Sequence, residues 1–150
     1  MPPKKDPVQD RLREFNLNCD NAAPENILPI VQKGLRDQHC LLVARAAEVC
    51  AHRCLYDCEE DLINAYQRFV KNPVKNDPNC TAKSAVVRAL VDLDCKDYNF
   101  FLSGLAYQQN EPVWGGSVDT AVDVRVSCAI GLTRTTYPRT LIELVKTLYD

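Results

Sequence analysis

Residues 50 to 58, CAHRCLYDC, hold the densest group of side chains in this sequence that could do chemistry. Three cysteines stand at steps of four residues, and a histidine lies between the first two. Cysteine and histidine are the usual ligands of zinc, and cysteine pairs also serve as redox groups. A tetrahedral zinc site needs four ligands, and this segment offers at most three. The sequence contains no C-x-x-C pair, which argues against zinc-knuckle and thioredoxin-type motifs.

The directions of these side chains on a helix also argue against a metal site. At about 100° per residue, Cys50 and Cys54 lie about 40° apart, while His52 points to nearly the opposite side. In the repeat register described below, His52 takes the place of a leucine in the two later repeats, so we expect it to face the core. The same register directs Cys50 and Cys54 toward solvent or a boundary. We predict no metal, no cofactor and free cysteines that pack as small hydrophobic side chains.

Length and composition are those of a single soluble domain spanning residues 1–150, with 46% hydrophobic and 25% charged residues. No stretch approaches the roughly 18 apolar residues that a membrane helix needs. The first 15 residues lack the apolar core of a signal peptide, so we expect a cytoplasmic protein with reduced thiols and no membrane contact. Residues 1–6 are expected to be disordered. The net charge of −2 argues against a dedicated nucleic-acid binder, which usually has a strong basic excess.

Apolar residues at spacings of three and four predict an all-α chain. Turn signals at Asn72-Pro73, at Asp77-Pro78 and in the run from 112 to 117 separate the helices. No segment alternates for long enough to predict a strand. The predicted helices are Pro7–Phe15, Pro24–Arg36, Cys40–Tyr56, Glu59–Val70, Thr81–Leu93, Tyr98–Gln108, Val118–Thr133 and Pro138–Tyr149.

Three of these helices share a pattern when Arg45, Lys83 and Arg125 are superimposed, at spacings of 38 and 42 residues. Small or aliphatic residues recur two, four and six positions later, and a helix with a bulky apolar face follows each time. One such pair cannot bury both of its faces, so the pattern predicts a right-handed α-α superhelix of about four helical pairs. A compact helical bundle with an alanine-rich stripe is the alternative.

The segments LVARAAEVCAHRCL, AKSAVVRALVDL and VDVRVSCAIGL, each followed by its second helix, resemble HEAT repeats of the armadillo-like α-solenoid superfamily. The stretch from KNDPNC to GGSVDTA is also similar to a group of bacterial HEAT-repeat proteins with no assigned activity. The resemblance covers roughly residues 24–150. It implies an α-solenoid fold, and repeats of this kind indicate fold far better than function.

Two regions are candidates for binding a partner. The loop NEPVWGGSVDT carries the only tryptophan, Trp114, which we interpret first as a plug between repeats and second as an anchor for a partner. The resemblance implies that the second helices line a concave binding surface. The residues predicted to contact a partner are Trp114, Arg68, Lys71, Gln108, Arg139 and Lys146.

The sequence lacks nucleophile-elbow, zinc-peptidase and P-loop motifs, and its two histidines leave little for acid–base catalysis. We therefore predict a non-catalytic scaffold that binds a protein. One alternative is a nucleic-acid-binding or DNA-repair role resembling the HEAT-like alkyl-purine DNA glycosylases, and another is a role resembling the HEAT-type bilin lyases. The apolar end at Leu148-Tyr149 predicts either further sequence or a homo-oligomer formed through the C-terminal helix.

Overall fold

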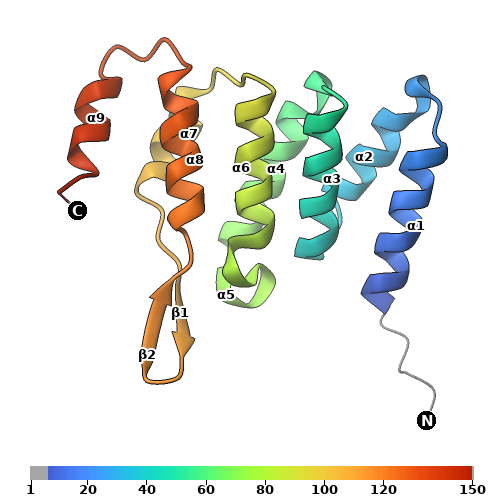
Figure 1. Ribbon diagram of the computed structural model, residues 1–150, viewed down its shortest axis with the longest axis horizontal. Helices are drawn as coiled ribbons and strands as arrows, with labels where there is room; N and C mark the ends of the chain where they lie inside the picture. Colours follow the sequence, from blue (N-terminus) through green and yellow to red (C-terminus); the bar gives the residue numbers. More distant parts are fainter. Residues whose placement is uncertain (1–6, 150) are drawn as a thin grey trace.

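The computed structural model describes residues 7–149, and helices make up most of this part of the chain (Figure 1). The all-α prediction is confirmed, apart from one two-stranded sheet. The predicted disordered segment, residues 1–6, lies outside the described residues. The longer helices are α1 (Pro7–Asn21), α2 (Ile27–Leu35), α3 (Cys40–His52), α4 (Glu59–Val70), α6 (Thr81–Asp92), α7 (Tyr98–Leu105) and α8 (Val122–Thr133). The short elements are η1 (Pro24–Asn26), η2 (Tyr56–Cys58), α5 (Pro73–Asn76), η3 (Pro78–Cys80), β1 (Asn110–Val113), β2 (Gly116–Asp119) and α9 (Thr140–Lys146).

In chain order, the longer helices and α9 make four consecutive pairs: α1 and α2, α3 and α4, α6 and α7, and α8 and α9. The first helices stand side by side in one row, and α2, α4 and α7 form a second row behind them (Figure 1). Each of these second helices packs most extensively against the first helix of the following pair: α2 against α3, α4 against α6, and α7 against α8. The pairs therefore interlock along the stack.

Residue size explains why the two rows can approach closely. The first helices bury small and β-branched side chains, such as Ala46 and Ala47 in α3 and Val86 in α6. The second helices supply large side chains to the same core, among them Phe69 in α4 and Phe101 in α7. Large side chains from one row thus fill the space that small ones leave in the other, which gives the core its packing density.

The repeat register differs from the predicted one. The residues that cap the C-termini of α3, α6 and α8 are Arg53, Leu93 and Arg134, which gives spacings of 40 and 41 residues. The next residue has a positive φ in the first two repeats, at Cys54 (52°) and Asp94 (58°). The backbone hydrogen bond from residue 55 to residue 50 likewise recurs from 95 to 90. Position 50 is therefore equivalent to 90 and 131, and position 52 to 92 and 133.

Two sequence predictions about the cysteine segment were wrong because of this register error. His52 is exposed at the end of α3 and does not face the core. Cys50 is fully buried, whereas Cys54 is exposed as expected. The predicted alignment rested on Lys83 and Arg45 being equivalent, yet Lys83 is completely buried and Arg45 is exposed. Lys83 and Arg45 are both basic, but they do not occupy equivalent positions in the repeat.

Cys50 and Cys58 form a buried pair of thiols. The Cys50 thiol donates a hydrogen bond to the Leu55 carbonyl over 3.4 Å and also lies within hydrogen-bonding reach of Cys58. The hydrogen bond to Cys58, together with burial, raises the pKa of Cys50, and the same contact lowers the pKa of Cys58. All eight cysteines are free thiols. Within residues 7–149, no group of three or more His, Cys, Asp or Glu side chains is arranged to hold a metal ion.

Thiol labelling tests the burial of the cysteines. Cys54 is exposed and the other seven are buried, and burial raises the pKa of Cys95 to about 11 and that of Cys128 to about 12. Because the thiolate is the reactive form, we expect a short pulse of iodoacetamide at about pH 8 to modify Cys54 much faster than the others. Peptide mass spectrometry reads the sites, and urea-unfolded protein provides the fully labelled control. Equal labelling of Cys50 and Cys54 in the native protein would contradict the observed register.

No helix in the described part of the chain combines the length and the apolar character that crossing a bilayer requires.

Candidate functional site

The segment predicted to be a loop forms a β-hairpin. β1 and β2 pair antiparallel from Asn110 opposite Asp119 to Val113 opposite Gly116, which leaves Trp114 and Gly115 as the connecting turn. Gly115 has a φ of +87°, a conformation that glycine adopts without a steric penalty. The sequence analysis missed both strands because four residues are too few to show a period of two. The hairpin projects beyond the ends of the helices (Figure 1).

Trp114 stands at the tip of the hairpin and is fully exposed, with a relative exposure of 104%. The interpretation of Trp114 as a plug between repeats was therefore wrong. Val113 and Val118 beside it are about half exposed, and strand alternation places both on the hairpin face that carries Glu111. The segment from 112 to 118 contains no charged residue. The tip is thus an uncharged, mostly apolar surface held away from the helices.

The base of the hairpin is fixed on the β1 side by Glu111. Its Oε1 accepts hydrogen bonds from Gln109 Nε2 (2.7 Å), Thr120 Oγ1 (2.8 Å) and the backbone N–H of Asn79 (2.6 Å). Desolvation would raise the pKa of Glu111, but these hydrogen bonds outweigh it and hold the pKa below the ordinary value. Glu111 is therefore an ionised acceptor that joins the hairpin to the turn before α6.

Asp119 fixes the β2 side in the same way. Its Oδ1 accepts from the backbone N–H groups of Gln109 (3.0 Å) and Ala121 (2.9 Å), and its Oδ2 pairs with Arg125 of α8 (2.6 Å). Despite desolvation, these contacts lower the pKa of Asp119. Arg125 also donates to the Tyr107 carbonyl (2.9 Å). Both strands of the hairpin are thereby tied to the helical body.

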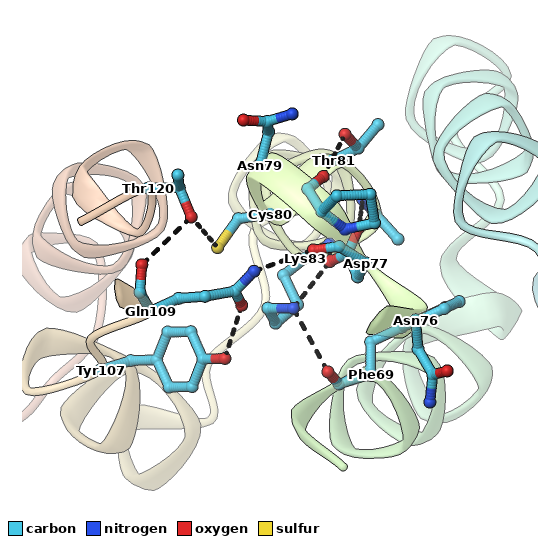
Figure 2. Close-up of polar contacts among 12 residues, drawn as sticks. Phe69, Asn76, Asp77, Asn79, Cys80, Thr81, Lys83, Tyr107, Gln109 and Thr120 are labelled. Carbon is cyan, nitrogen blue, oxygen red and sulfur yellow. Dashed lines mark hydrogen bonds and ion pairs between the residues drawn. The ribbon is translucent and has the colours of Figure 1, made fainter. Parts of the chain in front are cut away.

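A buried ion pair lies beneath the hairpin base (Figure 2). The Lys83 ammonium is 2.8 Å from Asp77 Oδ2, and both side chains have a relative exposure of 0%. Lys83 Nζ also donates to the Phe69 carbonyl at the end of α4 (3.2 Å) and lies 5.7 Å from the centre of the Tyr107 ring. Gln109 Nε2 donates to the backbone carbonyl of Asp77 (2.9 Å).

Asp77 also binds backbone N–H groups at the start of α6. Its carboxylate accepts the backbone N–H groups of Ala82 (2.7 Å) and Lys83 (3.0 Å), which have no acceptor within the helix. The turn between them is strained, because Asn79 and Cys80 hold positive φ values of 58° and 53°. We call Asp77, Lys83, Gln109, Glu111 and Thr120 the anchor network, since together they join α4, α6 and the hairpin.

The anchor network contains acidic and basic side chains. These side chains bond to one another and to the backbone, which is the arrangement of a structural network. Asp77 and Lys83 have no exposed surface on which a substrate could bind, and hydrogen bonds occupy both charged groups. Cys80 Sγ lies 3.6 Å from Thr120 Oγ1, and burial raises the pKa of this thiol. The network therefore positions the hairpin.

The five other residues predicted to bind a partner do not cluster at one site. Arg68 is half-buried, and its Nη2 donates to the carbonyls of Leu35 and Asp37, both at 2.8 Å, so its guanidinium is occupied within the chain. The remaining four are exposed: Lys71 after α4, Gln108 after α7, Arg139 before α9, and Lys146 in α9, where it pairs with Glu143 at 3.1 Å. Gln108 directly precedes the anchor-network residue Gln109.

A groove between α4 and α7 was missed by the sequence analysis. It has a volume of about 420 Å³ and lies on the side of the second helices. Gln67 and Asn99, one from each helix, and the rings of Tyr66 and Phe100 form part of its walls. The groove is lined by Ile63, Tyr66, Gln67, Val70, Asp97, Asn99, Phe100 and Ser103.

Comparisons of the chain with protein-family models, with curated proteins and with solved structures found no match. A functional proposal therefore rests on the geometry of the hairpin and its base.

Proposed function

We propose that the chain is a HEAT-repeat-type α-solenoid of the cytoplasm that binds a protein partner through the tip of its hairpin and has no catalysis of its own. The observation that carries this proposal is the full exposure of Trp114 on a hairpin whose base is held by Glu111 and Asp119. Tryptophan is the residue type most enriched among the energetically dominant residues of protein interfaces. A fixed base reduces the entropy lost when the tip is ordered by a partner.

A protein is favoured over a nucleic acid by the surface charges. Nucleic-acid binding depends on lysines and arginines that are free to neutralise phosphates. Here the hairpin tip is uncharged, the net charge is −2, and several surface cations in the described part of the chain are paired with carboxylates. The surface pairs are Arg11 with Asp37, Arg36 with Asp61, Arg45 with Glu48, Arg88 with Asp123, Lys96 with Asp94, and Lys146 with Glu143, beside the half-buried pair of Arg125 with Asp119. Within residues 7–149, no contact specifically supports a role resembling that of the bilin lyases.

The groove between α4 and α7, together with Lys71 and Gln108 at the ends of these helices, offers additional contact area in this proposal. Arg68 is not included, because its guanidinium bonds to the end of α2.

Photo-crosslinking tests the proposal at the residue that carries it. A chain with p-benzoylphenylalanine at position 114, expressed in its native cell, is expected to form covalent adducts with one or a few proteins. The matched control carries the same group at Tyr56, another largely exposed aromatic residue. Adducts with nucleic acid, or the same adducts from both positions, would contradict the proposal.

The sole tryptophan also provides a direct readout of binding. Because Trp114 is fully exposed, its emission is expected to be that of a hydrated indole and to change little on unfolding in urea. Adding the purified crosslinked partner to the wild-type chain is expected to shift this emission to the blue as the indole is buried. The Trp114→Ala variant lacks this fluorophore, so its affinity is measured by titration calorimetry, and it is expected to bind at least about tenfold more weakly than the wild type.

A further inference from the structure

The hairpin of β1 and β2 has two outer edges that no other strand covers within residues 7–149, where the sheet has two strands. The Thr120 N–H donates to the Gln109 carbonyl over 2.9 Å, so these two residues form a hydrogen-bonded pair. In an antiparallel ladder such pairs alternate with non-hydrogen-bonded ones. Counted along the observed register, Pro112 and Ser117 form a non-hydrogen-bonded pair, and their backbone groups point to the outer edges.

The outer edge of β1 is interrupted. Pro112 has no N–H group, so this edge lacks a donor where an added strand would need one. β1 also lies on the side of the turn before α6, because Glu111 accepts a hydrogen bond from the backbone N–H of Asn79 (2.6 Å). An extended chain therefore cannot form a complete hydrogen-bond ladder along β1.

The outer edge of β2 is complete and open. Ser117 and Asp119 each direct an N–H and a carbonyl group outward, and within residues 7–149 the backbone of Ser117 bonds to no other group. Gly116, Ser117 and Val118 are exposed, and Figure 1 shows β2 on the side of the hairpin away from α5. Natural proteins usually protect such an edge with a lysine, a proline or a bulge, and β2 has none of these.

One face of the hairpin beside this edge has room for an apolar side chain. Val113, Gly116 and Val118 share that face, since directly paired residues lie on the same side of a sheet. A methyl group at Gly116 would meet nothing within 4 Å, so there is open space next to both valines. A large apolar side chain of a strand added along β2 can fill this space.

We propose that the protein partner adds an extended segment to β2 as a third strand, with an apolar residue opposite Gly116. This inference rests on the proposed function, because the same partner also contacts Trp114 in the adjoining turn. Main-chain hydrogen bonds to Ser117 and Asp119 supply affinity, and the apolar contacts on the valine face supply sequence preference. The fixed base holds β2 extended before the partner binds, which lowers the entropy lost on binding.

A phage-displayed library of random peptides of about ten residues, long enough for one strand, tests this proposal. Selection on the full wild-type chain is expected to enrich peptides with an apolar, proline-free centre. Ser117→Pro removes the outward N–H of β2 and is expected to weaken binding of the selected peptides at least about tenfold in titration calorimetry. The matched control is Asn110→Pro, which removes an outward N–H from β1 and is expected to leave the affinity unchanged.

Both substitutions leave the hydrogen bonds between β1 and β2 in place. Each falls in a non-hydrogen-bonded pair, and Pro112 already occupies such a position. Slow hydrogen exchange of the Val118 amide, which lies in a hydrogen-bonded pair with Glu111, shows that a variant keeps its hairpin. If Ser117→Pro loses it, an ester bond in place of the Ser117 amide removes the same N–H without adding a ring.

Hydrogen exchange in the wild-type chain gives an independent readout of the added strand. A selected peptide is expected to slow exchange of the Ser117 and Asp119 amides at least about tenfold. A library that yields no binding peptide, equal affinity of wild type and Ser117→Pro, or unchanged exchange at both amides would overturn the added strand. So would a dimer of the chain itself that Ser117→Pro abolishes.

The Trp114→Ala variant separates this proposal from the proposed function. If Trp114→Ala weakens binding of the selected peptides and Ser117→Pro does not, the added strand is wrong and binding at the tip stands. If Ser117→Pro weakens binding and Trp114→Ala does not, the tip is wrong as the binding site and the open edge of β2 stands.

Discussion

Replacing Asp77 by asparagine is expected to lower the free energy of unfolding by about 3–5 kcal/mol. The amide keeps the shape of the side chain but removes the charge that faces the Lys83 ammonium at 2.8 Å in a site with no solvent exposure. The NH2 group of asparagine also cannot accept a hydrogen bond, so one of the backbone N–H groups of Ala82 and Lys83 loses its acceptor. A buried charge without its counter-charge costs far more than the pair itself contributes.

Lys83→Met is expected to cost less than Asp77→Asn. The Asp77 carboxylate would keep both backbone N–H donors at the start of α6, where the helix dipole also favours a negative charge. The methionine fills most of the volume of the lysine stem. The double variant is expected to be less destabilised than the sum of the two single ones, since it removes both charges together.

Urea unfolding followed by circular dichroism measures these differences. The matched control is the ion pair between Arg88 and Asp123, which has a similar distance of 2.9 Å but is largely exposed. Arg88→Met is expected to change the free energy of unfolding by no more than about 1 kcal/mol. If Asp77→Asn were as mild as Arg88→Met, the buried pair would not support the fold as we infer.

Gly131→Ala in α8 is the second substitution with a large expected effect. A methyl group at this position would overlap the ring of Phe101, which is fully buried in α7. In an exposed helix the change from glycine to alanine would stabilise by about 1 kcal/mol. Here the overlap is expected to reverse the sign and give a net loss of about 1–3 kcal/mol, because the packed core cannot move aside cheaply.

Two further variants separate steric overlap from other effects of the added methyl group. Gly116→Ala in β2 has nothing within 4 Å of the new methyl group and is expected to change stability by less than about 0.5 kcal/mol. In the Phe101→Leu background, Gly131→Ala is expected to cost clearly less, because the outer ring atoms are gone. Thermal unfolding compares the wild-type chain with the four variants, Phe101→Leu alone included. An unchanged cost in the leucine background would show that the ring is not the obstacle.

Much of the fold could be predicted because helix periodicity is a local property of the sequence. The bounds predicted for α4, Glu59–Val70, are those observed, and the start of α6 at Thr81 was also correct. The register failed because it was aligned on basic residues. Lys83 is basic to neutralise a buried carboxylate, whereas Arg45 bonds to Asn16 and Glu48 at the surface. Residue type alone does not show that Lys83 is a buried counter-ion while Arg45 lies at the surface.

The candidate site could be predicted only in part. Trp114 stood out as the single tryptophan on a glycine-containing loop, but its exposure depends on a hairpin too short to leave a pattern. The anchor network was not predicted, since its members come from separate segments between Asp77 and Thr120 and meet only after folding. The signal that could have located one member is Asp77, an acidic residue in a turn shortly before a helix.

The anchor network also has a consequence for the order in which the chain folds. The hairpin base takes hydrogen-bond partners from the turn before α6 and from Arg125 in α8, and that turn is itself joined to the end of α4 through Lys83. A two-stranded hairpin is marginal by itself in water. It can therefore take its final direction only after three helical pairs have docked, so an incompletely folded chain does not present Trp114 in its native setting. Native display of the tip therefore reports that α4, α6 and α8 have docked.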